Sequence, residues 1–147
     1  MVLKALISAV IITILPIYSW DGLTPYSRHE EYSRVEPPVS AKCPEWWNLA
    51  QSVGWSAQQL PMLDRVLWRE SRCYDNVHNP TDPSGGSFGL LQINGFWVKY
   101  LSDADLLNAR SDLFDPEINL RAGLAIYNYA HMKHGKGWSP WGFLRDT

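Results

Sequence analysis

The chain has 147 residues, enough for one ordinary domain, of which 46% are hydrophobic and 19% charged. This globular composition excludes disorder along most of the chain. A net charge of −2 gives no electrostatic footprint for nucleic acid, so no nucleic-acid partner is expected. Eight tryptophans are the anomaly in the composition, and seven of them follow Lys42.

The N-terminus is typical of a targeting segment. Residues 5–20 follow Lys4 without a charge, and the run from Ala9 to Leu15 is strongly apolar. A membrane-spanning helix needs about 20 apolar residues, and Pro16 interrupts this shorter stretch. Residues 1–19 therefore favour a secretory signal peptide, with a retained membrane anchor as the alternative. Both predict a protein that is secreted or extracytoplasmic.

Residues 20–42 are predicted to be a flexible linker. They mix both signs of charge with three prolines and show no apolar periodicity, so they cannot bury enough surface to offset their ordering entropy. The folded domain is expected over residues 43–147. Its two cysteines, Cys43 and Cys73, favour a disulfide in an exported chain, although two unrelated buried thiols have the same spacing.

Four helices are predicted in the domain, separated by turn-forming residues. Ser56–Gln59 fits a capping box before the second helix. Asp115–Glu117 supplies a cap, a first-turn proline and an acidic residue at the start of the last helix. The irregular loop at 75–87 is rich in Gly and Pro and leaves room for a short hairpin. The helices are expected at Pro44 to about Gly54, Pro61 to about Ser71, Leu90 to Leu101 with an irregular start, and Pro116 to about His134, with a further cap at Ser102–Asp105.

Glu70 is the first candidate for chemistry. It shares a helix face with the apolar Leu63 and Leu67, so its carboxyl is expected against the core in the last turn of the helix. Burial and the negative end of the helix dipole both favour the protonated acid, the form that general-acid catalysis requires. The alternative is an ordinary glutamate paired with Arg69 or Arg72.

Two amides, Gln92 and Asn94, lie among apolar neighbours just after the loop. Buried amides need hydrogen-bond partners. The hydroxyls and N-acetyl groups of a sugar are suitable partners, and the backbone of the turn itself is the alternative.

Three motifs follow one another in a specific order, and together they resemble a known family. They are Glu70-Ser71-Arg72 with Asn79-Pro80, then Gly86-Ser87-Phe88-Gly89-Leu90-Leu91-Gln92-Ile93-Asn94, then Asp115-Pro116-Glu117-Ile118-Asn119-Leu120-Arg121-Ala122-Gly123. The set resembles the lysozyme-like superfamily, in particular the soluble lytic transglycosylase (SLT) domain family of peptidoglycan-cleaving enzymes. Leu91 stands where that family usually has Met. The resemblance covers Trp55 to about Trp141.

The resemblance implies a mainly α fold, a small lysozyme-like helical domain with an irregular loop beside the catalytic helix. It implies that Glu70 is the catalytic acid and base and that the enzyme cuts the MurNAc-β-1,4-GlcNAc bond of peptidoglycan glycan strands, leaving 1,6-anhydro-MurNAc ends. It implies no cofactor and no metal, and we expect a monomer. The substrate-binding residues would be Ser87, Gln92, Asn94 and Tyr127, with Tyr129 competing for the role of Tyr127.

Two other functions stay open. Animal C-type lysozymes, which share the Gly-x-Leu-Gln-Ile-Asn string, have a second carboxylate where this chain has Ser87, which favours the single-glutamate mechanism here. A lysozyme-type hydrolase acting on the same or a chitin-like glycan is the alternative, because Asp75 or Asp82 could orient a water. A glycan-binding module without activity is a function of a different class.

The tryptophans divide into two expected groups. Aromatic rings stack on the apolar faces of sugars, and a small domain also needs them in its core. Trp97, Trp138 and Trp141 are the candidates for a saccharide groove, and Trp46, Trp47, Trp55 and Trp68 are expected in the core.

Overall fold

The computed structural model describes residues 34–143. All the described residues belong to one compact unit, Ser33–Thr147. The signal peptide or anchor expected at 1–19 and most of the linker expected at 20–42 lie outside the described residues. Within residues 34–143, no helix combines the length and the apolar character needed to cross a bilayer.

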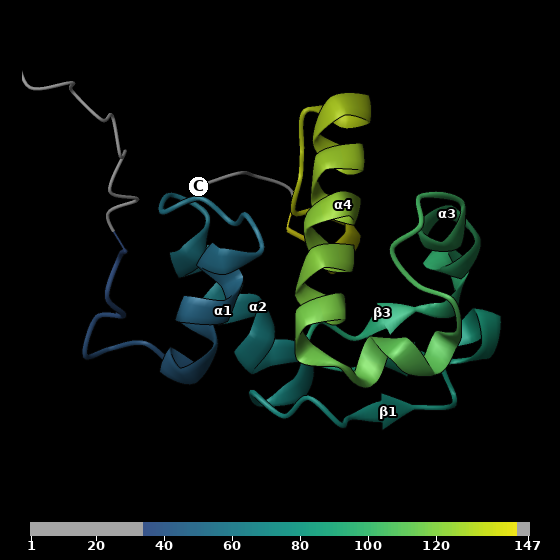
Figure 1. The fold of residues 1–147 in the computed structure, drawn as a ribbon, viewed down its shortest axis with the longest axis horizontal. Coiled ribbons are helices and arrows are strands. Elements are labelled where there is room, and N and C mark those ends of the chain that lie inside the picture. The colour runs from purple at the N-terminus through teal and green to yellow at the C-terminus, as the bar shows by residue number, and fades with distance from the viewer. Residues whose placement is uncertain (1–33, 144–147) are drawn as a thin grey trace, which may run out of the picture. The chain divides into compact units, whose positions relative to one another are not determined.

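The domain is mainly α-helical with one small sheet, as the sequence predicts (Figure 1). The helices are α1 (Trp47–Ser52), α2 (Leu60–Ser71), α3 (Val98–Asp103) and α4 (Pro116–His134). The strands are β1 (His78–Asn79), β2 (Ser87–Phe88) and β3 (Ile93–Asn94). Short 3-10 turns lie at Pro44–Trp46, Pro83–Gly85, Gly95–Trp97, Arg110–Phe114 and Ser139–Trp141.

Helix α2 begins and ends where its flanking residues predict. The side-chain oxygen of Gln59 accepts the backbone N–H of Ser56 at 2.8 Å, as in a capping box. Arg72 ends the helix in the left-handed conformation, at φ 56°. The apolar face of the helix, with Leu63 and Leu67, is buried. This arrangement places Glu70 in the last turn.

Helix α4 is the long central element of the domain. The carboxylate of Asp115 accepts the backbone N–H of Ile118 at 3.0 Å and caps the start of the helix. Gly135 ends it with φ 64°. In Figure 1, α4 stands between α1 and α2 on one side and α3 on the other. Its buried side therefore supplies one wall of the core.

The three strands form an antiparallel sheet in the order β1-β2-β3, which provides the short hairpin that the loop leaves room for. Phe88 pairs with His78 on one side and Ile93 on the other. The short helix expected over Leu90 to Leu101, with an irregular start, therefore forms only in its second half, because its first residues form a turn and β3. The side-chain oxygen of Asn94 accepts the N–H of Phe96 at 2.9 Å, and helical structure begins only there.

A second helix signal is also wrong. The cap expected at Ser102–Asp105 marks the end of α3 instead, because Asp105 is in the left-handed conformation with φ 56°. The next helical turn, Arg110–Phe114, follows an extended Ala109. Ser and Asp favour turns as well as caps, so the two ends of a helix resemble each other in sequence.

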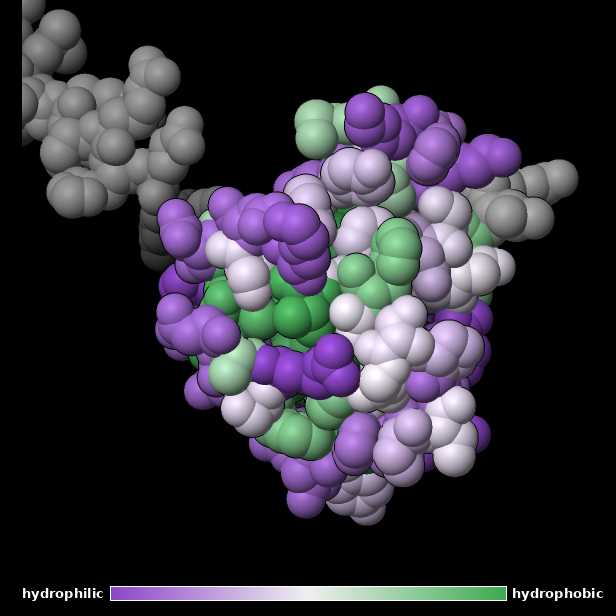
Figure 2. Space-filling model, turned by 90° about the vertical axis from the view of Figure 1, so that its right-hand side faces the viewer, coloured by the Kyte–Doolittle hydropathy of each residue, from purple (hydrophilic) through white to green (hydrophobic). Residues whose placement is uncertain are grey.

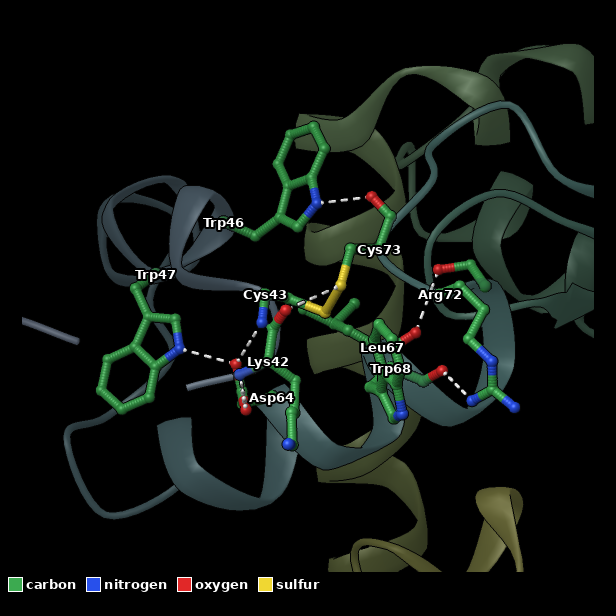
Figure 3. The surroundings of a disulfide bond; sticks show 10 residues. Lys42, Cys43, Trp46, Trp47, Asp64, Leu67, Trp68, Arg72 and Cys73 are labelled. Carbon is green, nitrogen blue, oxygen red and sulfur yellow. Dashed lines mark hydrogen bonds between the residues drawn. A yellow bond between two sulfur atoms is a disulfide. The ribbon is translucent and has the colours of Figure 1, made fainter. Parts of the chain in front are cut away.

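A disulfide joins Cys43 to Cys73, which confirms the expected pair (Figure 3). Beside it, the buried carboxylate of Asp64 accepts three hydrogen bonds. Its donors are the backbone N–H of Lys42 at 2.8 Å, that of Cys43 at 2.9 Å and the indole N–H of Trp47 at 3.1 Å. The start of the domain is thus fastened to α2 at two neighbouring points.

The fold begins before Cys43. The backbone N–H of Val35 donates to the side-chain oxygen of Gln51 at 2.7 Å, and the amide of Gln51 donates back to the carbonyl of Val35 at 2.9 Å. Val35, which was expected to belong to the flexible linker, is therefore hydrogen-bonded to α1. The reason is a tertiary contact that composition does not reveal.

Two tryptophans are not where the sequence predicts. Trp68 is 42% exposed on α2, where the guanidinium of Arg72 lies 5.0 Å from the centre of its ring. Trp138 is 2% exposed and stacks on Trp55 with ring centroids 5.3 Å apart, so it belongs to the core. On the face that carries α3, hydrophobic surface lies in a hollow between hydrophilic side chains (Figure 2).

Candidate active site

A cavity of about 380 Å³ opens at the end of α2. Its walls come from α2, the loop between β1 and β2, the sheet, α4 and the C-terminal turn. Four residues expected at the site, one acid and three polar side chains, lie in it together. The lining residues are Arg69, Glu70, Asp82, Pro83, Ser87, Gln92, Ile93, Asn94, Trp97, Ile126, Pro140 and Trp141.

Glu70 is held by a neighbouring cation. Its side chain is 23% exposed, and its Oε1 accepts hydrogen bonds from Nε of Arg69 at 3.0 Å and from Nη2 at 2.5 Å. The same guanidinium donates to the carbonyl of Trp141 and lies 4.2 Å from the ring centre of Phe143. The alternative considered from the sequence, a glutamate paired with Arg69, is therefore the arrangement in the structure. Arg69 also links this acid to the C-terminal turn.

A second carboxylate, Asp82, lies in the same cavity. Its Oδ2 accepts the hydroxyl of Ser87 at 2.6 Å, and its Oδ1 accepts the amide of Asn79 at 2.8 Å. The amide of Asn94 donates to the hydroxyl oxygen of Ser87 at 3.3 Å. Of the two loop acids considered from the sequence, Asp82 is in the lining and Asp75 is not.

Gln92 is fixed in a strained position at the turn between β2 and β3. Its φ is 45°, which L-residues rarely adopt. Its amide N–H groups donate to the carbonyls of Val77 at 3.0 Å and Gly89 at 2.9 Å. Both donors are used, so the amide oxygen is what this side chain offers to a ligand.

Asn119, which the sequence reading did not single out, holds this turn from behind. It is fully buried on α4, where its amide donates to the carbonyls of Phe88 at 3.0 Å and Leu113 at 2.7 Å. Its oxygen accepts the N–H of Leu91 at 2.9 Å. Gly89 has φ 70°, and a Cβ there would collide with Asn119 and the carbonyl of Leu113. The signal for this contact was the Asn within the third motif.

The aromatic candidates separate in the structure. Tyr127 is not in the lining and packs against Trp55 and Trp138, with ring centroids 5.7 and 4.8 Å away. Tyr129 packs against Trp97 at 5.6 Å, also outside the lining. The structure therefore does not bring Tyr127 together with Glu70, and the α4 residue in the lining is its neighbour Ile126.

Comparison with protein families gives a match for residues 47–143 to the family described as a lysozyme-like domain. The match spans α1 to the C-terminal turn and so includes every lining residue of the cavity. No curated protein and no solved structure matches the chain. The family match supports peptidoglycan-lytic activity in general. Since it covers more than half of the chain, this protein belongs to the lysozyme-like domain family.

Proposed function

We propose that the protein is an extracytoplasmic lytic transglycosylase that cuts the MurNAc-β-1,4-GlcNAc bond of peptidoglycan. The observation that carries this proposal is the position of Glu70. It stands at the end of α2, partly exposed, in a cavity whose lining also includes Ser87, Gln92 and Asn94. A carboxyl group within reach of a bound sugar is the element that glycosidic bond cleavage requires.

Glu70 would act twice in one reaction. As an acid it gives its proton to the glycosidic oxygen, and the C1–O bond breaks with its electron pair going to that oxygen. As a carboxylate it then takes the proton of the C6 hydroxyl, whose oxygen closes the 1,6-anhydro ring on C1. No water is consumed. Positioned acid–base catalysis of this kind typically contributes about 10²–10⁴-fold in rate.

The other lining residues would bind the glycan. Trp97 and Trp141 bring aromatic surface to the cavity, on which the apolar face of a sugar ring can stack. The amide oxygen of Gln92 can accept a hydrogen bond from a hydroxyl or from an N-acetyl N–H group, because its own N–H groups are used by the backbone. Tyr127 is not part of this proposal, since it lies outside the lining.

A second candidate function is hydrolysis of the same bond. The observation in its favour is Asp82, whose carboxylate is in the cavity with Glu70 and could orient a water for attack on C1. Hydrolysis leaves reducing ends, whereas transglycosylation leaves anhydro ends that are lighter by one water. Mass spectrometry of purified peptidoglycan digested with the protein separates the two products. We expect anhydro muropeptides, and a digest dominated by reducing ends would replace the first proposal by the second.

Glu70→Gln tests the acid directly, because it keeps the shape of the side chain and removes its proton chemistry. We expect a loss of at least about 10²–10⁴-fold in peptidoglycan cleavage, with glycan binding retained. Glu117→Gln on α4 is a matched control, since Glu117 is exposed and makes only a surface ion pair with Arg121. Equal activity of Glu70→Gln and the unaltered protein would contradict both enzymatic proposals. Binding without any cleavage by the unaltered protein would leave the glycan-binding module.

A further inference from the structure

We propose that a second cavity, between α3 and α4, binds the stem peptides of peptidoglycan while the glycan strand lies in the cavity of Glu70. Stem peptides are short chains with small apolar side chains and free carboxylates, and they are attached to the MurNAc units of the strand. This inference rests on the proposed function and adds a second part of the same substrate. Nothing in the family match assigns a ligand to this cavity.

The second cavity has the size and the lining of a ligand site. Its volume is about 550 Å³, within the range of about 300–1,000 Å³ that is typical of such sites. Four of its lining residues are aromatic, namely Phe96 and Trp97 from the turn Gly95–Trp97, Tyr100 from α3 and Tyr129 from α4. Phe96 is 70% exposed. Aromatic surface gathered in one exposed place is typical of an interaction site, because it adds little to the buried core.

Trp97 connects this cavity to the catalytic one, because it lines both. The turn that carries Trp97 is capped by Asn94, whose side-chain oxygen accepts the N–H of Phe96 at 2.9 Å, and Asn94 also lines the catalytic cavity. A strand bound beside Glu70 therefore has the second cavity on the far side of one tryptophan. A peptide that branches from this strand can enter the second cavity while the glycosidic bond is cut.

The rings form the walls of a pocket and not a flat platform. Trp97 meets Tyr100 at an interplanar angle of 70° and Tyr129 at 77°, with ring centroids 5.8 and 5.6 Å apart. Tyr100 and Tyr129 are tilted by 58° with centroids 5.2 Å apart. These mutual contacts hold the rings in place before a ligand binds. The face of a sugar stacks on one open ring, whereas walls that meet at steep angles suit compact groups such as the methyl group of an alanine.

The charges at this cavity favour a ligand with carboxylates. Lys99 and Asp103, both in the lining, pair with each other at 2.8 Å. Lys133 lies 6.0 Å from the ring centre of Tyr129, and within residues 34–143 it forms no ion pair with a carboxylate. Its positive charge, beside His134 of the lining, is therefore available to a ligand. In intact peptidoglycan the sugars are uncharged, so the peptide is the part of the substrate that this charge attracts.

Cleavage of two substrates tests the inference: soluble glycan strands that carry their peptides, and the same strands after an amidase has removed the peptides. We expect kcat/KM of the unaltered protein to be about 10-fold higher on the strands with peptides, mainly through a lower KM, since covering one aromatic side chain is worth about this factor. Phe96→Ala should remove most of this preference, because it deletes a ring of the second cavity that does not line the catalytic one. Lys133→Gln should lower kcat/KM on the strands with peptides by about threefold, as expected for an exposed charge pair. Neither variant should alter cleavage of the strands without peptides.

Met132→Ala is the matched control, because Met132 is 78% exposed on α4 and lies outside the lining, and it should leave the preference unchanged. All rates are measured well below the unfolding midpoint of each variant, so that a structural role of Phe96 affects both substrates alike. If Phe96→Ala does not fold, Lys133→Gln decides, and an unchanged preference in that variant overturns the inference.

The outcomes distinguish this inference from the proposed function. An unaltered protein that cuts both substrates with equal kcat/KM overturns the inference alone. A Phe96→Ala variant that loses the same factor on both substrates also overturns it, because the cavity would then bind sugar. A protein that cuts neither substrate overturns the proposed function. Calorimetry with the peptides released by the amidase then decides the inference: binding that Phe96→Ala weakens supports a peptide site, and no binding overturns it.

Discussion

At the scale of single residues, Arg69 is the group that connects the acid to the rest of the fold. Its guanidinium is shared by Glu70, the carbonyl of Trp141 and the ring of Phe143. Because its side chain is 45% exposed, the ion pair itself contributes little to stability. The C-terminal turn thus helps to place the acid without depending on a strong buried pair.

Arg69→Met should lower the free energy of unfolding by about 1 kcal/mol, the sum of a weak ion pair and a partly exposed cation–π contact. Met keeps the apolar stem of the side chain and removes the charge. Urea denaturation measures the change, and Arg65→Met, on the exposed side of α2, is the control. A loss above about 3 kcal/mol would mean that the C-terminal turn relies on this contact far more than its exposure indicates.

Asn119→Ala should destabilise the protein much more, by about 3 kcal/mol. It removes the partner of a buried N–H and of two carbonyls at once, and each unsatisfied buried group costs about 1–3 kcal/mol unless water reaches it. Asn128→Ala is the matched control, since Asn128 is exposed on the same helix. Equal denaturation midpoints for the two variants would show that Asn119 does not hold the β2–β3 turn.

At the scale of elements, the turn Arg110–Phe114 is held by the carboxylate of Asp112. The backbone N–H groups of Ala109 and Asn108 donate to it at 2.9 and 2.8 Å and hold the pKa of Asp112 below its usual value. A carboxyl whose pKa is lower in the folded state stabilises the protein above the pKa of the unfolded chain. That contribution is lost as the pH falls through the folded pKa.

Asp112→Asn should therefore be less stable than the unaltered protein at pH 7, and the difference should shrink as the pH falls below about 4, the ordinary pKa of Asp. Thermal unfolding from pH 7 down to pH 2 measures the difference. A gap between the two proteins that stays constant over this range would show that the charge of Asp112 does not support the turn.

The elements also show what the sequence can reveal. Both ends of α4 follow from local rules, namely the Asp115 cap, a first-turn proline and the terminal Gly135. A first-turn proline also marks the start of α2, but Arg72 ends that helix with a positive φ that its residue type does not predict. The strands have two residues each, too few for an alternating pattern to be read. The first half of the expected helix at 90–101 failed for that reason, since β3 pairs with β2 in a hairpin whose strands are too short to show a pattern.

The candidate site divides in the same way. Glu70, Ser87, Gln92 and Asn94 are contributed by two sequence motifs, and the cavity contains all four. Tyr127 lies outside the lining, whereas its neighbour Ile126 is in it, because adjacent residues of a helix point about 100° apart. Asn119 and Asp64 support the site as buried polar residues. The third motif contains Asn119, but the sequence does not show which groups either residue contacts.

At the scale of the whole domain, α2 is tied to the chain at both of its ends. Asp64 in its first half accepts hydrogen bonds from Lys42 and Cys43, and Cys73 just beyond its last turn is bonded to Cys43 (Figure 3). The carbonyl of Cys73 also accepts the indole N–H of Trp46 at 2.8 Å. These contacts lie near both ends of the helix that carries Glu70. A change that loosens them should therefore lower the stability of the fold and also shift the position of the acid.

Reduction of the disulfide, or the double variant Cys43→Ser with Cys73→Ser, should lower the free energy of unfolding by about 3–4 kcal/mol. The bond closes a loop with a sequence separation of 30, and in the chain-entropy model a loop of that size removes this much from the unfolded state. The total free energy of unfolding of a domain of this size is roughly 5–15 kcal/mol.

Cleavage of peptidoglycan by the reduced protein should survive at 25 °C, because Asp64 still holds the backbone of residues 42 and 43. The reduced protein should lose this activity at a lower temperature than the oxidised protein. Asp64→Asn in the oxidised protein separates the effect of the hydrogen bonds from that of the disulfide, since it weakens the hydrogen bonds and leaves the disulfide intact. Thermal unfolding and residual activity, each with and without reductant, measure both effects. An unchanged unfolding midpoint after complete reduction would mean that the hydrogen bonds of Asp64 alone hold the start of the domain to α2.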